Sequence, residues 1–196
     1  MDDQRLMKTD SPDSNTMKSV MDRLKIFQPI SDDDAAKETM KWEFRRRQGL
    51  IASLAQGLGS RYSFAAASLK TYRVYHANQK PVLAALRKLI EDENGIAETT
   101  GVILFGSYGT GKDHLAAAAM YEAIAKYGVV CKWVNGRNLF GASRDAMSLE
   151  RAEETVIGPL VEPGIVCLSD VLPIGGELSA WNLDLLYRIL DARYRA

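Results

Sequence analysis

The second half of the chain alternates between short apolar runs and longer segments with helical spacing. Apolar runs at 101–105 (GVILF), 129–134 (VVCKWV) and 165–169 (IVCLS) have the length and composition of buried strands. Between them, residues 112–127 and 148–159 are predicted to be helical. Strands and helices that alternate in this way predict an α/β fold, with a parallel sheet covered by helices on both faces.

The last segment of the chain predicts one more helix. Ser179 is a suitable N-cap. The apolar residues that follow recur at helical spacing; they are Leu183, Leu186, Tyr187 and Leu190. Among the aromatic residues, Trp133, Trp181 and Tyr187 are predicted to lie in the core or to cover the sheet.

The first half of the chain is predicted to be helical after a polar tail. Residues 1–20 are polar and predict a disordered tail. Residues 21–60 form a helical region, because Ser31 and the acidic residues after it are typical of a helix start; one long helix or two short ones fit. Residues 61–79 predict an irregular aromatic connector, and residues 80–95 contain a helix that ends at Asn-Gly.

Residues 105–120 (FGSYGTGKDHLAAAAM) predict a phosphate-binding loop that leads into a helix. Glycines let backbone N–H groups approach phosphate oxygens, Lys112 is placed to reach the β- and γ-phosphates, and the helix N-terminus adds partial positive charge. A glycine-rich turn without a ligand is the alternative. The predicted ligands are ATP and Mg²⁺. The predicted nucleotide-binding residues are Gly106, Ser107, Tyr108, Gly109, Thr110, Gly111, Lys112, Asp113 and His114.

Asp113 departs from the loop pattern, which has a magnesium-binding hydroxyl at this position. The acidic element that such a site needs is found only at 165–173, where Ser169 and Asp170 follow the apolar run. Asp170 is either the magnesium-side acid or, if Ser169 fills that place, the water-positioning acid. In one interpretation, Asp113 and Ser169 have exchanged the usual hydroxyl and carboxylate, and together they bind one Mg²⁺. In the other interpretation, both positions have lost their metal-binding role. The predicted metal-binding residues are Asp113, Ser169 and Asp170, and the predicted catalytic residues are Lys112 and Asp170.

The composition and the charge balance exclude some classes of protein and leave a soluble, cytoplasmic one as the prediction. The 196 residues contain 25 basic and 25 acidic side chains, so no global field attracts the chain to nucleic acid or membrane. Arg45, Arg46 and Arg47 either contact DNA phosphates or form a solvated helix face. Cys131 and Cys167 lack metal-site spacing and are predicted to be buried strand residues. The polar N-terminus is not a signal peptide, so the sequence predicts a cytoplasmic protein without membrane spans.

The loop with its GKDHLAAA continuation, the aromatic lead-in and the final helix resemble the DnaC/IstB-type helicase loaders, which are AAA+ ATPases. The resemblance covers roughly 58–196 and implies that residues 61–196 are a partial AAA+ core. It also implies ATP binding, with hydrolysis left open, and a replicative helicase or transposase as partner. Single-stranded DNA and further copies of the chain are additional implied partners.

The resemblance also implies a strand that the sequence up to Ala196 does not provide. It would lie between 101–105 and 165–169, and it would be followed by an arginine finger. We therefore expect exposed apolar surface and marginal stability. Two other classes of function stay open, a nucleotide-binding adaptor without turnover and a P-loop kinase; the second is disfavoured because no lid-like segment follows 165–169.

Overall fold

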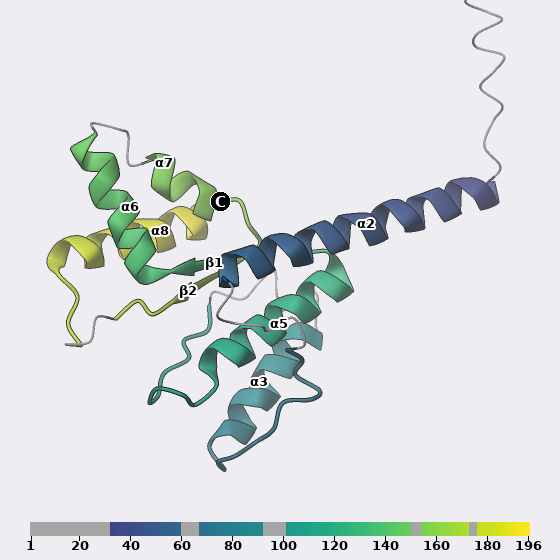
Figure 1. Ribbon diagram of the computed structural model, residues 1–196, viewed down its shortest axis with the longest axis horizontal. Helices are drawn as coiled ribbons and strands as arrows, with labels where there is room; N and C mark the ends of the chain where they lie inside the picture. The colour runs from purple at the N-terminus through teal and green to yellow at the C-terminus, as the bar shows by residue number, and fades with distance from the viewer. Residues whose placement is uncertain (1–31, 60–66, 92–100, 150–153, 173–175) are drawn as a thin grey trace, which may run out of the picture. The chain divides into compact units, whose positions relative to one another are not determined.

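The computed structural model describes residues 32–59, 67–91, 101–149, 154–172 and 176–196 (Figure 1). The chain divides into two compact units, Met1–Trp42 and Glu43–Ala196. The predicted tail at 1–20 and the first part of the predicted helical region lie outside the described residues, so both stay predictions.

Helix α2 (Asp32–Leu58) is continuous, which confirms the single long helix among the two alternatives. Its part in the first unit is exposed and carries two ion pairs at i,i+3 spacing, as expected for a solvated helix face. In the second unit, Leu54 and Leu58 are buried in the core. Arg45 and Arg46 are exposed, and Arg47 forms an i,i+4 ion pair with Glu43.

Two parallel strands form the centre of the second unit. Strand β1 (Cys131–Asn135) pairs with β2 (Ile165–Ser169), so that Cys131 lies opposite Ile165 and Asn135 opposite Ser169. Alternate residues face opposite sides, as the period of two requires. Both strand predictions are confirmed, with β1 displaced by one or two residues from the predicted 129–134.

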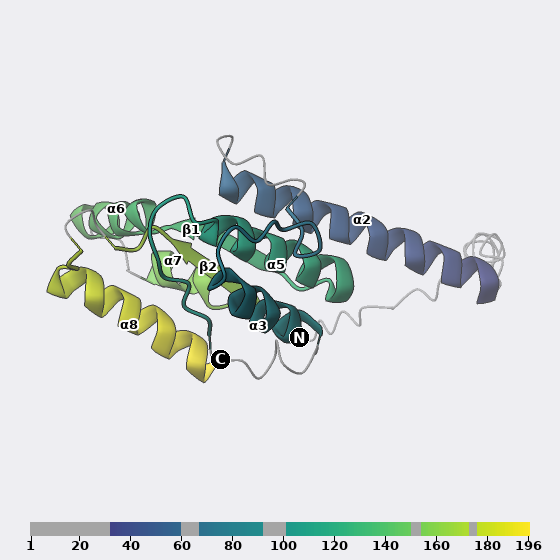
Figure 2. The same ribbon diagram turned by 90° about the horizontal axis from the view of Figure 1, so that it is seen from below.

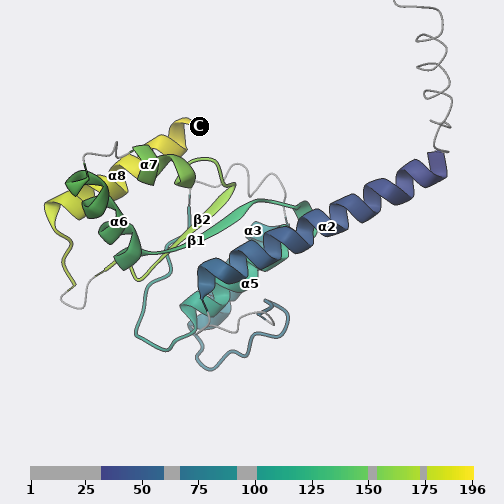
Figure 3. The same ribbon diagram turned by 45° about the horizontal axis from the view of Figure 1, so that its top comes forward.

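Helices cover both faces of this strand pair (Figures 1 and 3). On one face, α3 (Gln79–Glu91), α5 (Lys112–Tyr127) and the end of α2 form a core with Trp133. On the other, a second core contains Val166 and Leu168. Its helices are α6 (Gly136–Ser148), α7 (Glu154–Ile157), the 3-10 turn η2 (Gly158–Leu160) and α8 (Ala180–Arg195). The predicted helix–sheet–helix arrangement is therefore present.

The predicted strand at 101–105 is wrong for this structure. The segment is not hydrogen-bonded into the sheet, and Val102, Ile103 and Phe105 are 52, 87 and 91% exposed. A strand needs a neighbour to satisfy its backbone groups. None of the described residues provides the strand that the resemblance places between 101–105 and β2. The expected exposure of apolar surface is confirmed at this segment.

The structure also corrects the helix predicted at 148–159: α6 ends at Ser148, and the described residues from Glu154 onward form the short helix α7 and the 3-10 turn η2. Helix α6 was not predicted; it begins where the Asn135 side chain accepts a hydrogen bond from the Arg137 N–H. In α8, the predicted cap Ser179 is confirmed. The prediction that Tyr187 lies in the core or covers the sheet is wrong, because its side chain is 66% exposed and Leu185 and Ile189 are buried instead.

The C-terminal end of α8 is attached to the turn that precedes β2. The guanidinium of Arg193 donates to the carbonyl oxygens of Leu160 at 2.7 Å, Pro163 at 2.8 Å and Gly164 at 3.2 Å, with a longer bond to Val161 at 3.3 Å. Burial lowers the pKa of Arg193 from its usual value. These bonds fix the second core around the turn, because each carbonyl would otherwise need another donor.

Candidate nucleotide-binding site

The glycine-rich loop leads directly into α5. Gly109 and Gly111 have φ angles of 75° and 85°, a left-handed conformation that glycine adopts at no steric cost. Gly111 is the N-cap of α5 and supplies no side-chain hydrogen bond. The first N–H groups of α5 are thus left without a capping side chain, which is the arrangement that binds anions at helix N-termini.

The side chain of Lys112 crosses the loop. Its Nζ lies 2.8 Å from the carbonyl oxygens of both Gly106 and Ser107. The hydroxyl of Thr110 also donates to the Ser107 carbonyl, at 2.9 Å. The ammonium group and the helix N-terminus therefore both place positive charge at the loop, which would favour an anion there.

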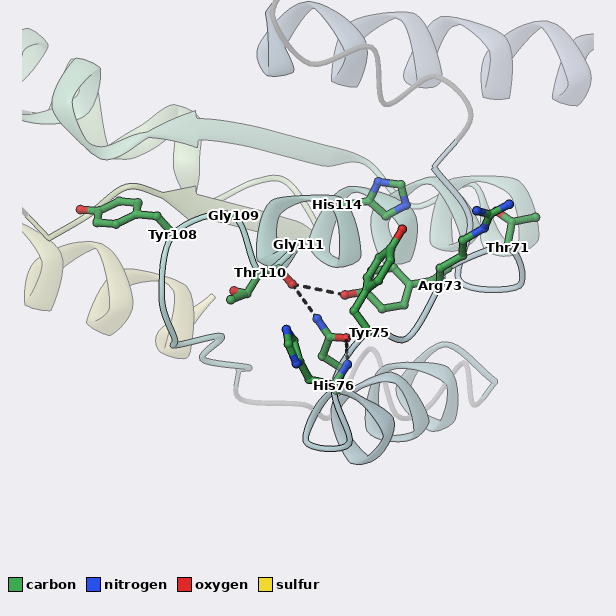
Figure 4. Close-up of a pocket in the computed structure, with 11 residues that line it drawn as sticks. Thr71, Arg73, Tyr75, His76, Tyr108, Gly109, Thr110, Gly111 and His114 are labelled. Atoms are coloured by element: carbon green, nitrogen blue, oxygen red, sulfur yellow. Dashed lines mark hydrogen bonds between the residues drawn. The ribbon is translucent and has the colours of Figure 1, made fainter.

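Residues from the aromatic lead-in hold the loop from outside. The carbonyl oxygen of Thr110 accepts hydrogen bonds from the Tyr72 hydroxyl at 3.3 Å and from the Gln79 amide at 3.0 Å (Figure 4). The Gln79 carbonyl in turn accepts from the backbone N–H groups of Tyr75 and His76. Sequence reasoning missed Tyr72 and Gln79. The only signal was a run of aromatic residues immediately before a predicted helix.

A pocket of about 540 Å³ lies between the lead-in segment and the loop. The rings of Tyr72 and His114 form a tilted contact in its wall, with centroids 5.6 Å apart. Tyr108 points away from the other labelled residues and is 84% exposed (Figure 4). The lining residues are Thr71, Tyr72, Arg73, Tyr75, His76, Gln79, Tyr108, Gly109, Thr110, Gly111 and His114.

Asp113 and Ser169 are in direct contact, although 56 residues separate them in sequence. The buried Ser169 hydroxyl lies 3.1 and 3.2 Å from the two carboxylate oxygens of Asp113. Burial raises the pKa of Asp113, as does the nearby charge of Asp170, while the Ser169 hydrogen bond and Lys112 oppose the rise. The two residues that depart from the expected pattern thus form one polar pair.

Asp170 is held separately at the end of β2. It has a left-handed φ of 52°, and its carboxylate accepts a hydrogen bond from the Asn135 amide at 3.2 Å. The backbone of α6 approaches closely here: a Cβ at Gly136 would lie 2.8 Å from the Asp170 carbonyl oxygen and 2.7 Å from the Val171 Cα. Within the described ranges, no group of three or more His, Cys, Asp or Glu side chains could hold a metal ion.

The two cysteines lie in the paired strands β1 and β2. Both are free thiols; Cys131 is buried and Cys167 is half-buried. Burial raises the pKa of each to about 12.

The helices of the described segments include none that is long and apolar enough to cross a bilayer.

Comparison with solved structures adds a likeness of fold. The sequence matches no protein-family model and no curated protein. The crystal structure of the DnaC helicase loader is similar to this chain, with 25% identity, a TM-score of 0.59, and coverage of 67% of this chain and 72% of that chain. Together with the helix–sheet–helix layers, this likeness gives the chain an α/β, AAA+/P-loop-like fold.

Proposed function

We propose that this chain is an ATP-binding AAA+ module of helicase-loader type. The observation that carries the proposal is the loop at the N-terminus of α5, where Lys112 lies across the Gly106 and Ser107 carbonyls. A bound phosphate group would replace these carbonyls as the partner of the Lys112 ammonium. It would also accept hydrogen bonds from the uncapped N–H groups of α5. The likeness to the DnaC helicase loader supports the choice among P-loop proteins.

The pocket beside the loop fits the nucleoside part of ATP. It is continuous with the phosphate loop, since Gly109, Thr110 and Gly111 line both. Tyr72 and His114 offer aromatic surface for a base, and the Gln79 amide holds the loop at Thr110. Sites for nucleosides combine aromatic surface with polar groups that fix the orientation of the ligand, and the lining of this pocket has both.

The residues available for Mg²⁺ are one carboxylate and one hydroxyl. Asp113 and Ser169 supply the oxygen ligands that Mg²⁺ prefers, and the phosphates of ATP and water would supply the others. Mg²⁺, when bound, neutralises the phosphate charge. Asp113 and Ser169 would hold it by exchanging their mutual hydrogen bond for metal contacts, and Asp170 would orient water from the end of β2.

A nucleotide-binding adaptor without turnover is the second candidate. It is favoured by the Asn135–Asp170 hydrogen bond, which engages the acid that hydrolysis would need. In either form, we propose a replicative helicase or transposase as the protein partner, with single-stranded DNA as a further ligand. Phosphate release measured on the ATP-saturated chain separates the two candidates.

The test of ATP binding is calorimetric titration with Lys112→Ala. We expect roughly 100-fold weaker binding of ATP and ADP, since a charge-assisted contact of about 1.5–3 kcal/mol is lost. Lys126→Ala is the matched control, because Lys126 lies on the same helix far from the loop and should leave affinity unchanged. Equal affinity of the wild type and Lys112→Ala would contradict the proposal.

A further inference from the structure

The pocket beside the phosphate loop lies where two helices begin. Figure 2 shows α3 and α5 side by side. Gln79 is the first residue of α3, Gly111 is the N-cap of α5, and both line the pocket. The remaining lining comes from the loop, from the start of α5 and from the lead-in segment before α3. The hydrogen bonds of these residues determine which part of a nucleotide the pocket can recognise.

The side chain of Gln79 is engaged with protein groups. Its carbonyl oxygen accepts from the N–H groups of Tyr75 at 2.7 Å and His76 at 3.0 Å, which fills both of its lone pairs. Its amide nitrogen donates one hydrogen to the Thr110 carbonyl at 3.0 Å. One N–H of this side chain is therefore left for a ligand, and no acceptor.

The hydroxyl of Tyr72 is engaged with the same carbonyl. It donates its proton to Thr110 at 3.3 Å. It also lies against the loop backbone, because a Cβ at Gly111 would be 2.9 Å from the hydroxyl oxygen. A pair of adjacent donor and acceptor groups on one side chain is what distinguishes one base from another. Neither Tyr72 nor Gln79 has such a pair free.

The pocket offers a base mainly aromatic surface. The rings of Tyr72, Tyr75, His76 and His114 all line it, and those of Tyr72 and His114 are in tilted contact. Burial raises the pKa of Tyr72, and the nearby Tyr75 adds to the rise, so these two side chains lie close together. Every base has a π-face, and stacking on aromatic side chains therefore tolerates any base.

The charged group in this lining does not distinguish the bases either. Arg73 lines the pocket, and none of the described lining residues is an aspartate or a glutamate. A guanidinium has only donors, and each of the four bases has acceptors on its edges. Arg73 is exposed, so its N–H groups stay hydrated where a base offers them no acceptor.

We propose that this site selects the triphosphate and not the base, so that it binds purine and pyrimidine nucleoside triphosphates with similar affinity. The proposal rests on the proposed nucleotide binding at the loop and names the ligand class of that site. A site rejects a wrong ligand strongly where that ligand leaves buried polar groups unpaired. Here the groups of Gln79 and Tyr72 are paired with protein atoms in the absence of any ligand, so no base is penalised in this way.

The first test is calorimetric titration of the full chain with ATP, GTP, CTP and UTP in the presence of Mg²⁺. Inorganic tripolyphosphate is the reference ligand for the loop alone. We expect the four dissociation constants to lie within about 10-fold of one another, a spread of about 1.4 kcal/mol, with the purines tighter because they stack more strongly. A larger spread would overturn the proposal and leave nucleotide binding intact. If neither the nucleotides nor tripolyphosphate bind, the proposed function fails and this proposal fails with it.

The second test separates stacking from recognition of a base edge. Tyr75 suits it, because its ring lines the pocket at 75% exposure and takes no part in the bonds to Thr110. Tyr75→Ser should weaken all four nucleotides by the same factor of about 10, with the affinity for tripolyphosphate unchanged. Tyr75→Phe keeps the ring and should restore the lost affinity for all four.

Tyr194→Ser is the matched control for this substitution. Tyr194 is an 83% exposed tyrosine on α8, outside the lining of the pocket, so its loss should leave all five affinities unchanged. A loss of affinity for one base alone, in either Tyr75 variant, would show that the Tyr75 hydroxyl recognises a base edge, and it would overturn the proposal.

Discussion

The hydrogen bond between Ser169 and Asp113 predicts a measurable coupling between α5 and the end of β2. Ser169→Ala removes a buried donor to a carboxylate, a contact of about 1.5–3 kcal/mol. Asp113→Ala leaves the Ser169 hydroxyl without its acceptor, at a cost of about 1–3 kcal/mol, but it also removes a half-buried charge, which offsets part of that cost. We therefore expect the single effects to differ and the coupling energy to be about 1.5 kcal/mol or more.

Urea unfolding of the wild type, both single variants and the double variant measures this coupling. Tryptophan fluorescence follows unfolding, because Trp133 is buried in β1, which pairs with the strand that carries Ser169. Ser148→Ala combined with Asp113→Ala is the control, because the Ser148 hydroxyl donates to the Asp145 carbonyl in α6. The control pair should be additive within about 0.5 kcal/mol. A Ser169–Asp113 coupling no larger than that would refute the contact.

The same two residues determine whether magnesium strengthens or weakens the binding of ATP. If they share one Mg²⁺, Asp113→Thr weakens binding of magnesium-ATP, and the double exchange Asp113→Thr with Ser169→Asp restores it, with a coupling on the order of 1 kcal/mol. If both positions have degenerated, Asp113→Thr removes a charge that repels phosphate and binding improves. Tighter binding by the single variant therefore excludes a shared metal.

Three further predictions follow from the site and the core. Gln79→Ala leaves the Thr110 carbonyl with one donor fewer and should weaken ATP binding about 10-fold by calorimetry, since one hydrogen bond of about 1 kcal/mol and the loop position are lost. Cys131 should react with iodoacetamide at pH 8 about 1000-fold more slowly in the folded chain than in urea, because a pKa raised from 9.0 to about 12 suppresses the thiolate; equal rates would contradict its burial. Because the folded-state pKa of Asp113 is raised, its ionisation destabilises the fold above that pKa. The stability advantage of Asp113→Asn over the wild type should be largest near pH 7 and should shrink as the pH falls toward 4; a pH-independent difference would show an unshifted carboxylate.

Features of the fold that depend on neighbouring residues in the sequence were predicted well. The loop, the helix after it and the Ser179 cap depend on glycines, a capping hydroxyl and spacing within a few residues, and the structure has them where the sequence places them. Strand β2 was predicted with its bounds, since an apolar run between Pro-Gly and Ser-Asp leaves little choice.

Features that depend on distant partners could not be predicted. Residues 101–105 have the composition of a strand, but a strand exists only where a neighbour pairs with it, and sequence periodicity does not report the neighbour. In α8, the apolar sets containing Leu185 and Tyr187 both have helical spacing, so the pattern could not choose the buried face. The Gln79 bond to Thr110 joins residues 31 positions apart and has no local signal.

The bonds that Arg193 makes have a consequence for the order in which the chain folds during synthesis. The turn before β2 presents carbonyl groups whose donor lies 33 residues downstream of Leu160. At translation rates of 5–20 residues per second, the donor is added about 2 to 7 s after that carbonyl. Until Arg193 is in place, the carbonyl groups of this turn depend on water as their donor. Helix α8 therefore completes the connection into β2, and a released chain truncated before Arg193 should expose this turn to proteases.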